Sequence, residues 1–489
     1  MAKHYDDLLT LCGWEKNEIE DERPRIEESF RRLELGPEDM KTADTWVRTY
    51  QDVSLMGVRK LLGAWIKELI DMILAKDEGL KPVYYGMPAI TGPGFIMAGA
   101  SDDVFVCCPD YIITQVMGHI FNKLTPIIVA GEQNGMPPGH ALCSLWQVRM
   151  GGLAKGIIPV PAMTVSSSYF CDMSAIGDTL MRGLYGTTAA VIDSYMDGRW
   201  GEFPEVRPER ITFLGEQINN ALKKAEKILN ITITPDAMEK GTRGARECAD
   251  RIARIIEIMR ADPVPWNANG LQLLEGLAPA STRRGITEGN KALDILISEL
   301  EERVAKGIGS PGLKKGAPRV MSYHLHIGDP RCNRAVEESG MVIPVTVVLT
   351  WLGGLPVKPD KVYPTAGENI AAMEFLRGLP FGSNGSLDRF IQAADFVGLD
   401  GFILKTLYNC RPAAVSSRFG KKYLEEKTGL PAIMIEEDMV DSRVYSADYH
   451  RTQLETFGEL LIARNAWKNV DNYEEEIMEF EAKLRSSEA

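Results

Sequence analysis

The chain lacks a run of apolar residues long enough to cross a membrane. Its longest apolar stretches are interrupted by proline and glycine, as in GIIPVPAMTV at 156–165, whereas a transmembrane helix needs about 18 or more apolar residues. The N-terminal segment MAKHYDDLLTLCGWEKNEIEDE is acidic and polar, unlike a secretory signal peptide. These absences predict a soluble, cytoplasmic protein.

Concentrated positive charge and nucleotide-binding motifs are also absent. The net charge is −13, and lysine and arginine are scattered among acids, which argues against nucleic acid as a partner because phosphate binding needs a basic surface. Neither GxGxxG nor GxxxxGK[ST] occurs, so ATP is not expected to bind through a P-loop. HExxH and GxSxG are missing as well, although a triad of distant residues stays open.

Cysteine is scarce, with eight residues in 489, which indicates free thiols or metal ligands rather than a disulfide scaffold. Cys143 (HALCSLWQVRMGG), Cys171 (SSSYFCDM) and Cys410 (LYNCRP) each end an apolar run that is typical of a strand or a strand exit. Ligand sites of α/β domains collect in the loops after strand ends. Three thiolates converging there could bind an iron–sulfur cluster or a metal with one position open. Alternatively, the three are small buried hydrophobes.

Other residues that could carry chemistry are fewer. Cys107 and Cys108 are adjacent on a predicted strand, where their side chains point to opposite faces, which favours a structural role. His324 and His326 are two residues apart and share a strand face, so they could bind a metal, donate protons or pair with an anionic substrate. In the acidic run IEEDMVDSR, Glu437 is a candidate general base; the alternative is a solvated loop.

The length predicts two or three domains. Short β-rich runs alternate with helical patterns, which predicts βαβ units and parallel sheets. We therefore expect an α/β protein with two parallel-sheet (flavodoxin/Rossmann-like) domains, a helical N-terminal extension and a helical middle region. The expected division is 1–80 helical extension, 81–206 first α/β domain, 207–308 helical region, and 309–489 second α/β domain with a C-terminal helix.

The expected strands are 81–86, 103–108, 125–131 and 156–165 in the first domain, and 319–328, 341–351, 400–409 and 431–437 in the second. A continuous helical pattern is expected over 177–196, GDTLMRGLYGTTAAVIDSYM. A helix is also expected to close the chain from about 448.

Taken as a set, several motifs resemble one family. They are CSxxxxR at Cys143 to Arg149, the polar run ending in CDM at Cys171, the CRP that starts at Cys410, and the segment 428–461. Over roughly residues 80–465, the chain resembles the catalytic-component subunits of the 2-hydroxyacyl-CoA dehydratase and class I (ATP-dependent) benzoyl-CoA reductase family. Its long N-terminal segment is similar to the larger subunit of the pair.

The resemblance implies a [4Fe–4S] cluster held by Cys143, Cys171 and Cys410 in the cleft between two α/β domains. One iron site would then stay open, and it could bind a thioester carbonyl as a Lewis acid and pass it one electron to give a ketyl radical anion. The neighbouring polar residues Ser144, Arg149 and Arg411 are expected to bind and tune the cofactor. The candidates for proton transfer are His324, His326 and Glu437.

The resemblance also implies partners: a related second catalytic subunit, a separate ATP-hydrolysing iron–sulfur activator, and an acyl-CoA substrate. The first hypothesis is an iron–sulfur subunit of an anaerobic enzyme that reduces an aromatic acyl-CoA, like benzoyl-CoA reductase. An (R)-2-hydroxyacyl-CoA dehydratase subunit is the alternative within the family. A noncatalytic electron-relay or pocket-forming partner, and a cluster-free α/β protein whose cysteines are core residues, are two further alternatives.

Overall fold

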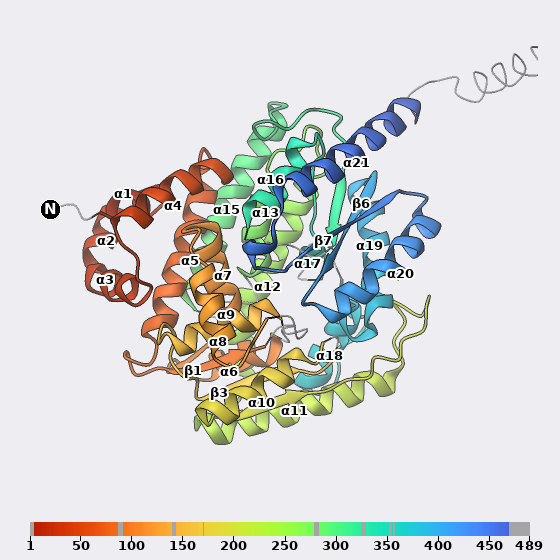
Figure 1. Ribbon diagram of the computed structural model, residues 1–489. Coiled ribbons are helices and arrows are strands. Elements are labelled where there is room, and N and C mark those ends of the chain that lie inside the picture. The colour runs from red at the N-terminus through yellow and green to blue at the C-terminus, as the bar shows by residue number, and fades with distance from the viewer. Residues whose placement is uncertain are drawn as a thin grey trace, which may run out of the picture.

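The computed structural model describes residues 4–86, 91–138, 143–169, 171–277, 283–323, 329–351, 355 and 357–468. Two parallel sheets lie in separate parts of the molecule, surrounded by helices (Figure 1). Among the described residues, no helix is long and apolar enough to cross a membrane. The predicted α/β class with a helical extension is therefore confirmed, whereas the boundaries at 80, 206 and 308 remain predictions.

The N-terminal extension is helical. Its helices are α1 (Asp6–Leu11), α2 (Lys16–Asp21), α3 (Arg23–Arg32), α4 (Pro37–Tyr50) and α5 (Met56–Leu74). Helix α5 is buried on most of its surface and packs against α15. A Cβ on Gly57 would lie 2.6 Å from the Leu296 backbone, so glycine permits this close helix contact.

The first sheet has four parallel strands in the order β2-β1-β3-β4. The strands are β1 (Lys81–Tyr85), β2 (Val104–Cys107), β3 (Met163–Ser167) and β4 (Ala189–Ile192). The helices of this half are α6 (Gly92–Ala100), α7 (Pro109–His119), α8 (Thr125–Gln133), α9 (Ser144–Ala154) and α10 (Met173–Tyr185). This order places the switch point of the sheet between β1 and β3, where doubly wound folds bind ligands beyond the carboxyl ends of the strands.

The middle region is helical and connects the two sheets. It contains α11 (Pro208–Leu229), α12 (Pro235–Ile258), α13 (Ala268–Glu275) and α15 (Arg284–Ala305). Helix α11 packs on α18 of the second half, and α12 packs on α6 of the first. Helix α13 lies between the halves, because Gln115 of α7 donates to its Gln272 carbonyl while Asn333 of the second half donates to its Gln272 side chain.

The second sheet has the parallel strands β5 (Val320–Tyr323), β6 (Gly401–Leu407) and β7 (Ala432–Glu437) in the order β5-β6-β7. Parallel bridges at Val342 and Thr346 add a short segment to the free side of β5. With that segment counted, both sheets have the same order of chain segments. The remaining elements are α16 (Pro330–Glu338), α17 (Val347–Trp351), α18 (Ala366–Leu376), η1 (Leu379–Phe381), α19 (Ser383–Val397), α20 (Arg411–Thr428), η2 (Ser442–Val444) and α21 (Ala447–Lys468).

Three expected elements are wrong. The segment 125–131 is helix α8, and 347–351 is helix α17, although both are rich in β-branched residues. Helix α8 forms because it packs tightly on α9: a Cβ on Gly131 would lie 2.0 Å from the Gln147 carbonyl oxygen. The helix expected over 177–196 ends at Gly186, which has a φ of +69°, and the chain continues as β4.

Candidate functional site

The three singled-out cysteines all lie at the start of a helix. Cys143 is the N-cap residue of α9, Cys410 is the N-cap residue of α20, and Cys171 lies two residues before α10. Their thiols face the backbone N–H groups of Leu145, Ala413 and Met173, respectively. Free N–H groups and the positive end of the helix dipole stabilise an anionic sulfur at each position.

These cysteines also differ from the others in accessibility and come together in space. Of the eight free cysteines, these three are partly accessible and the other five are buried. The pKa of Cys143 is raised by the neighbouring Cys410 and Cys171, and that of Cys410 is raised by Cys171. Since α9 and α10 belong to the first half and α20 to the second, the thiols converge where the halves meet.

The environment makes three thiolates costly without a cation. Burial raises the pKa of Cys143 well above its ordinary value and that of Cys410 to about 12. Burial also raises the pKa of Cys171, which Arg411 opposes. Thiolate, rather than thiol, is the metal ligand, and metal binding displaces its proton. Three thiols on separate helix ends therefore fit a cationic, thiolate-bound group such as an iron–sulfur cluster.

Asp438, which directly follows β7, connects two of these cysteine segments. Ser144 Oγ donates to its Oδ1 at 2.5 Å, and Asn409 Nδ2 donates to its Oδ2 at 2.6 Å. The side chain is 1% exposed. Asp438 therefore ties the residue after Cys143 to the residue before Cys410. It was one of several acids in a predicted loop, and sequence did not distinguish it from its neighbours.

Arg411 connects the other pair of cysteine segments. Its guanidinium forms an ion pair with Asp172, so the residue after Cys410 contacts the residue after Cys171. Both side chains are about half exposed. The positive charge of Arg411 lowers the pKa of both adjacent thiols, which places it close to them.

Arg149 uses most of its donors within the first half. Its guanidinium is buried, donates from Nε to Asp110 Oδ1 at 2.5 Å and from Nη2 to Oδ2 at 2.8 Å, and also donates to the Tyr85 carbonyl. The guanidinium stacks on Trp146, with Cζ 4.2 Å from the centre of the ring. These contacts connect α9, whose N-cap residue is Cys143, to the carboxyl end of β1 and the start of α7.

Glu437, the last residue of β7, is buried beside Lys405 and His450. Its Oε2 lies 3.2 Å from Lys405 Nζ, and its Oε1 lies 3.0 Å from His450 Nε2. Neither neighbour was singled out in the sequence. The predicted His324 and His326 lie outside the described residues.

Glu275, at the end of α13, is a functional candidate that sequence reasoning missed. It is fully buried and accepts a hydrogen bond from Thr346 Oγ1. Burial raises its pKa well above the ordinary range, and Lys405 opposes that shift. Burial also raises the pKa of Tyr111, to which Glu275, Cys108 and Cys143 contribute. Tyr111 is therefore close to both Glu275 and Cys143. The sequence did not reveal this proximity, because Glu275 is more than 100 positions from the other two residues.

Comparison with known proteins identifies the family of this chain and several distant relatives. A family model described as 2-hydroxyglutaryl-CoA dehydratase, D-component, matches residues 117–461. The alpha subunit of (R)-2-hydroxyglutaryl-CoA dehydratase from Acidaminococcus fermentans is 20% identical over 275 residues, which cover 56% of this chain and 55% of that protein. This chain thus spans about half the length of that relative.

Two further relatives are covered more fully. The alpha subunit of (R)-phenyllactyl-CoA dehydratase from Clostridium sporogenes is 21% identical over 332 residues, covering 67% of this chain and 77% of that protein. A benzoyl-CoA reductase subunit from Thauera aromatica is 21% identical over 345 residues, covering 66% of this chain and 78% of that protein. The relatives are thus subunits of both dehydratases and a reductase.

Proposed function

Because the chain belongs to the 2-hydroxyglutaryl-CoA dehydratase D-component family, we propose that it is the iron–sulfur subunit of a low-potential acyl-CoA enzyme. Cys143, Cys171 and Cys410 would bind a [4Fe–4S] cluster. The observation that carries this proposal is the convergence of the three partly accessible cysteines. When bound, such a cluster supplies one-electron transfer and an open iron site that can act as a Lewis acid.

Between the two reactions of the family, we favour dehydration of an (R)-2-hydroxyacyl-CoA. The matching family model and two of the relatives described above carry dehydratase names, which supports this choice. Reduction of an aromatic acyl-CoA is the second candidate, supported by the Thauera aromatica relative. Either reaction needs a proton donor at a site shielded from water.

Glu275 suits the role of proton donor. Burial raises the pKa of its carboxyl well above the ordinary range, which favours the protonated form, and Tyr111 lies close to both Glu275 and Cys143. In dehydration, its proton would go to the hydroxide that leaves the substrate, producing water. The carboxylate that remains would then be stabilised by Lys405, whose charge acts on Glu275. A buried acid with a raised pKa is a common arrangement for such a donor.

We expect Glu275→Gln to lower the turnover of the assembled enzyme by about 10²- to 10⁴-fold, because the amide keeps the shape of the side chain but cannot give up a proton. Iron content should stay at the wild-type level. Turnover with an (R)-2-hydroxyacyl-CoA and iron per chain are the two measurements. Unchanged turnover would exclude Glu275 as the donor.

Glu337→Gln is the matched control for this variant. Glu337 is also buried, burial raises its pKa to about 7, and it accepts the backbone N–H of Ala268 on the N-terminal side of α13. Turnover should survive this change.

Because the pKa of Glu275 is raised in the folded state, the stability that protonation contributes is lost as pH rises through that raised value. Glu275→Gln should reduce this loss.

We propose that a related second subunit covers exposed apolar side chains on α10 and on α20, the two helices that start near Cys171 and Cys410. Large hydrophobic side chains on these helices are well exposed, with exposed fractions from 42% to 65%: Ile176, Leu184, Val415 and Phe419. In each helix the two residues are four or eight positions apart and share a face. Exposed apolar side chains that share one helix face are typical of interaction surfaces.

Phe419→Asp should weaken association with the second subunit by roughly 10- to 100-fold, since a buried phenylalanine contributes about 1.5–3 kcal/mol. Sedimentation of the mixed subunits measures the dissociation constant. Val362→Asp is the control, because Val362 is 88% exposed and belongs to neither of these helices. Equal loss in both variants, or no loss in the first, would contradict this interface.

The activity test combines the chain with its second subunit and an ATP-hydrolysing activator under anaerobic conditions. Formation of a 2-enoyl-CoA from an (R)-2-hydroxyacyl-CoA supports the dehydratase assignment, whereas ring reduction of benzoyl-CoA supports the second candidate. A fully iron-loaded complex that turns over neither class of substrate would favour the noncatalytic relay instead.

A further inference from the structure

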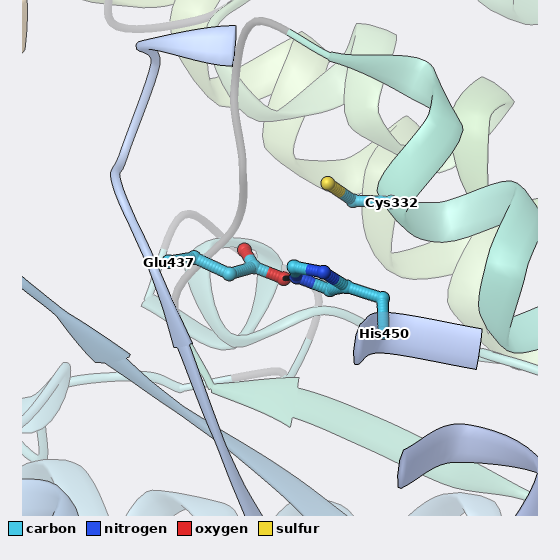
Figure 2. A group of neighbouring side chains, drawn as sticks. All are labelled: Cys332, Glu437 and His450. Carbon is cyan, nitrogen blue, oxygen red and sulfur yellow. Dashed lines mark hydrogen bonds and ion pairs between the residues drawn. The ribbon is translucent and has the colours of Figure 1, made fainter. Parts of the chain in front are cut away.

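A second group of metal-binding side chains lies in the second half of the molecule. Cys332 of α16, Glu437 at the end of β7 and His450 of α21 point toward one another (Figure 2). Their sulfur, oxygen and nitrogen ligand atoms all lie within 4.8 Å of one another, and all three residues are buried. Glu437 and His450 are 13 positions apart, and the convergence joins them to Cys332, which lies about 100 positions earlier in the chain.

The hydrogen bonds of His450 leave a lone pair in the middle of this group. Its Nδ1 lies 2.8 Å from the Ser446 carbonyl oxygen, and since a carbonyl only accepts, Nδ1 carries the hydrogen. In the neutral ring, Nε2 then presents a lone pair to Glu437 Oε1, 3.0 Å away. Two acceptors at this distance require a proton or a cation between them, and the Cys332 sulfur faces the same place.

We propose that Cys332, Glu437 and His450 bind a single zinc ion. Zinc prefers sulfur, nitrogen and carboxylate ligands at about 2.0–2.3 Å in a tetrahedron, which separates ligand atoms by roughly 3.3–3.6 Å. Nε2 and Oε1 are 3.0 Å apart and all three ligand atoms lie within 4.8 Å of one another, so zinc binding requires side-chain movements of at most about 1.5 Å. Three protein ligands leave the fourth position for a water molecule.

The surrounding contacts match those of known metal sites. The Nδ1–H group of His450 donates a hydrogen bond to the Ser446 carbonyl, and the second Glu437 oxygen lies beside Lys405. Such contacts are typical of the partners that orient metal ligands. Zinc with one thiolate and one carboxylate has no net charge, which leaves Lys405, 3.2 Å from the second Glu437 oxygen, as the buried positive charge beside it. Asp329 also lies nearby and is neutralised by Arg331.

Burial raises the pKa of Cys332 well above its ordinary value, so a cation is needed to hold its thiolate, as zinc does. The ion would cross-link α16, α21 and the end of β7. Asp438, which contacts the segments of Cys143 and Cys410, is the next residue. The zinc site is thus adjacent to the cysteine site but separate from it, and this inference does not depend on the proposed function.

The first test uses the complete wild-type protein, purified anaerobically together with any subunit that copurifies. Elemental analysis should find about one zinc per chain in addition to iron. Zinc-edge X-ray absorption should show one sulfur neighbour at about 2.3 Å with nitrogen or oxygen neighbours at about 2.0 Å. Absence of zinc, or zinc without a sulfur neighbour, would overturn the proposal.

Variants provide the second test. Cys332→Ser and His450→Gln should each lower zinc content at least tenfold while iron per chain stays constant. Cys248→Ser is the matched control, because Cys248 is fully buried in α12 and is not part of the ligand group, and it should retain zinc. Retention of zinc in both ligand variants would overturn the assignment. If a variant does not fold, the absorption spectrum of the wild type decides alone.

Discussion

Replacing any one of Cys143, Cys171 and Cys410 with alanine should remove the cluster, and with it all turnover. The wild type should hold about four iron and four sulfide per chain. Each helix start supplies a single thiol, so a missing ligand cannot be replaced by a neighbouring cysteine in the same segment. The measurements are iron and sulfide content and the electron paramagnetic resonance spectrum of the reduced protein, all made anaerobically.

Cys248→Ala is the control, since Cys248 is buried in α12 away from the site. Its iron content should match that of the wild type. Iron that survives all three substitutions would mean that other residues bind it, and Cys107 and Cys108 would be the next candidates. An iron-free wild type that folds and binds an acyl-CoA would leave a pocket-forming subunit as the function.

The second large effect concerns stability. Arg149→Ala should destabilise the first half of the molecule by about 3–5 kcal/mol, the usual result of leaving one partner of a buried ion pair alone. Asp110 is fully buried, and burial raises its pKa while Arg149 opposes that shift. Without the guanidinium, the carboxyl loses its charged partner and two hydrogen bonds. The midpoint of thermal unfolding should fall by on the order of 5–10 °C.

Two comparisons separate this effect from the mere loss of an arginine. Arg48→Ala removes the exposed ion pair to Asp44 in α4, and such pairs contribute little, so its unfolding midpoint should hardly move. The double variant Arg149→Met with Asp110→Asn should recover most of the lost stability, because it removes both buried charges. A midpoint unchanged in Arg149→Ala would show that the buried pair is not required for stability.

The sequence predicted the two parallel sheets because parallel strands buried on both faces appear as short apolar runs between helical patterns. It failed at 125–131 and 347–351, where an apolar run of five to seven residues fits a strand or a helix equally well. At 125–131, packing against α9 decided in favour of a helix. Helix α8 requires Gly131 to face the backbone of α9, and a contact with a helix that lies farther along the chain cannot be detected from local pattern.

By itself, the sequence determined the family and the α/β class. It contains three cysteine motifs that together resemble one family, and it lacks a P-loop. The expected place after a strand is confirmed for Cys171 and Cys410, which follow β3 and β6, but is wrong for Cys143, because the described element before it is helix α8. Tertiary structure decided which polar groups meet. Asp438 reaches Ser144, 294 positions away, and Glu437 meets Cys332 and His450. Burial, which sets the pKa of Glu275, likewise exists only once the two halves have packed around α13.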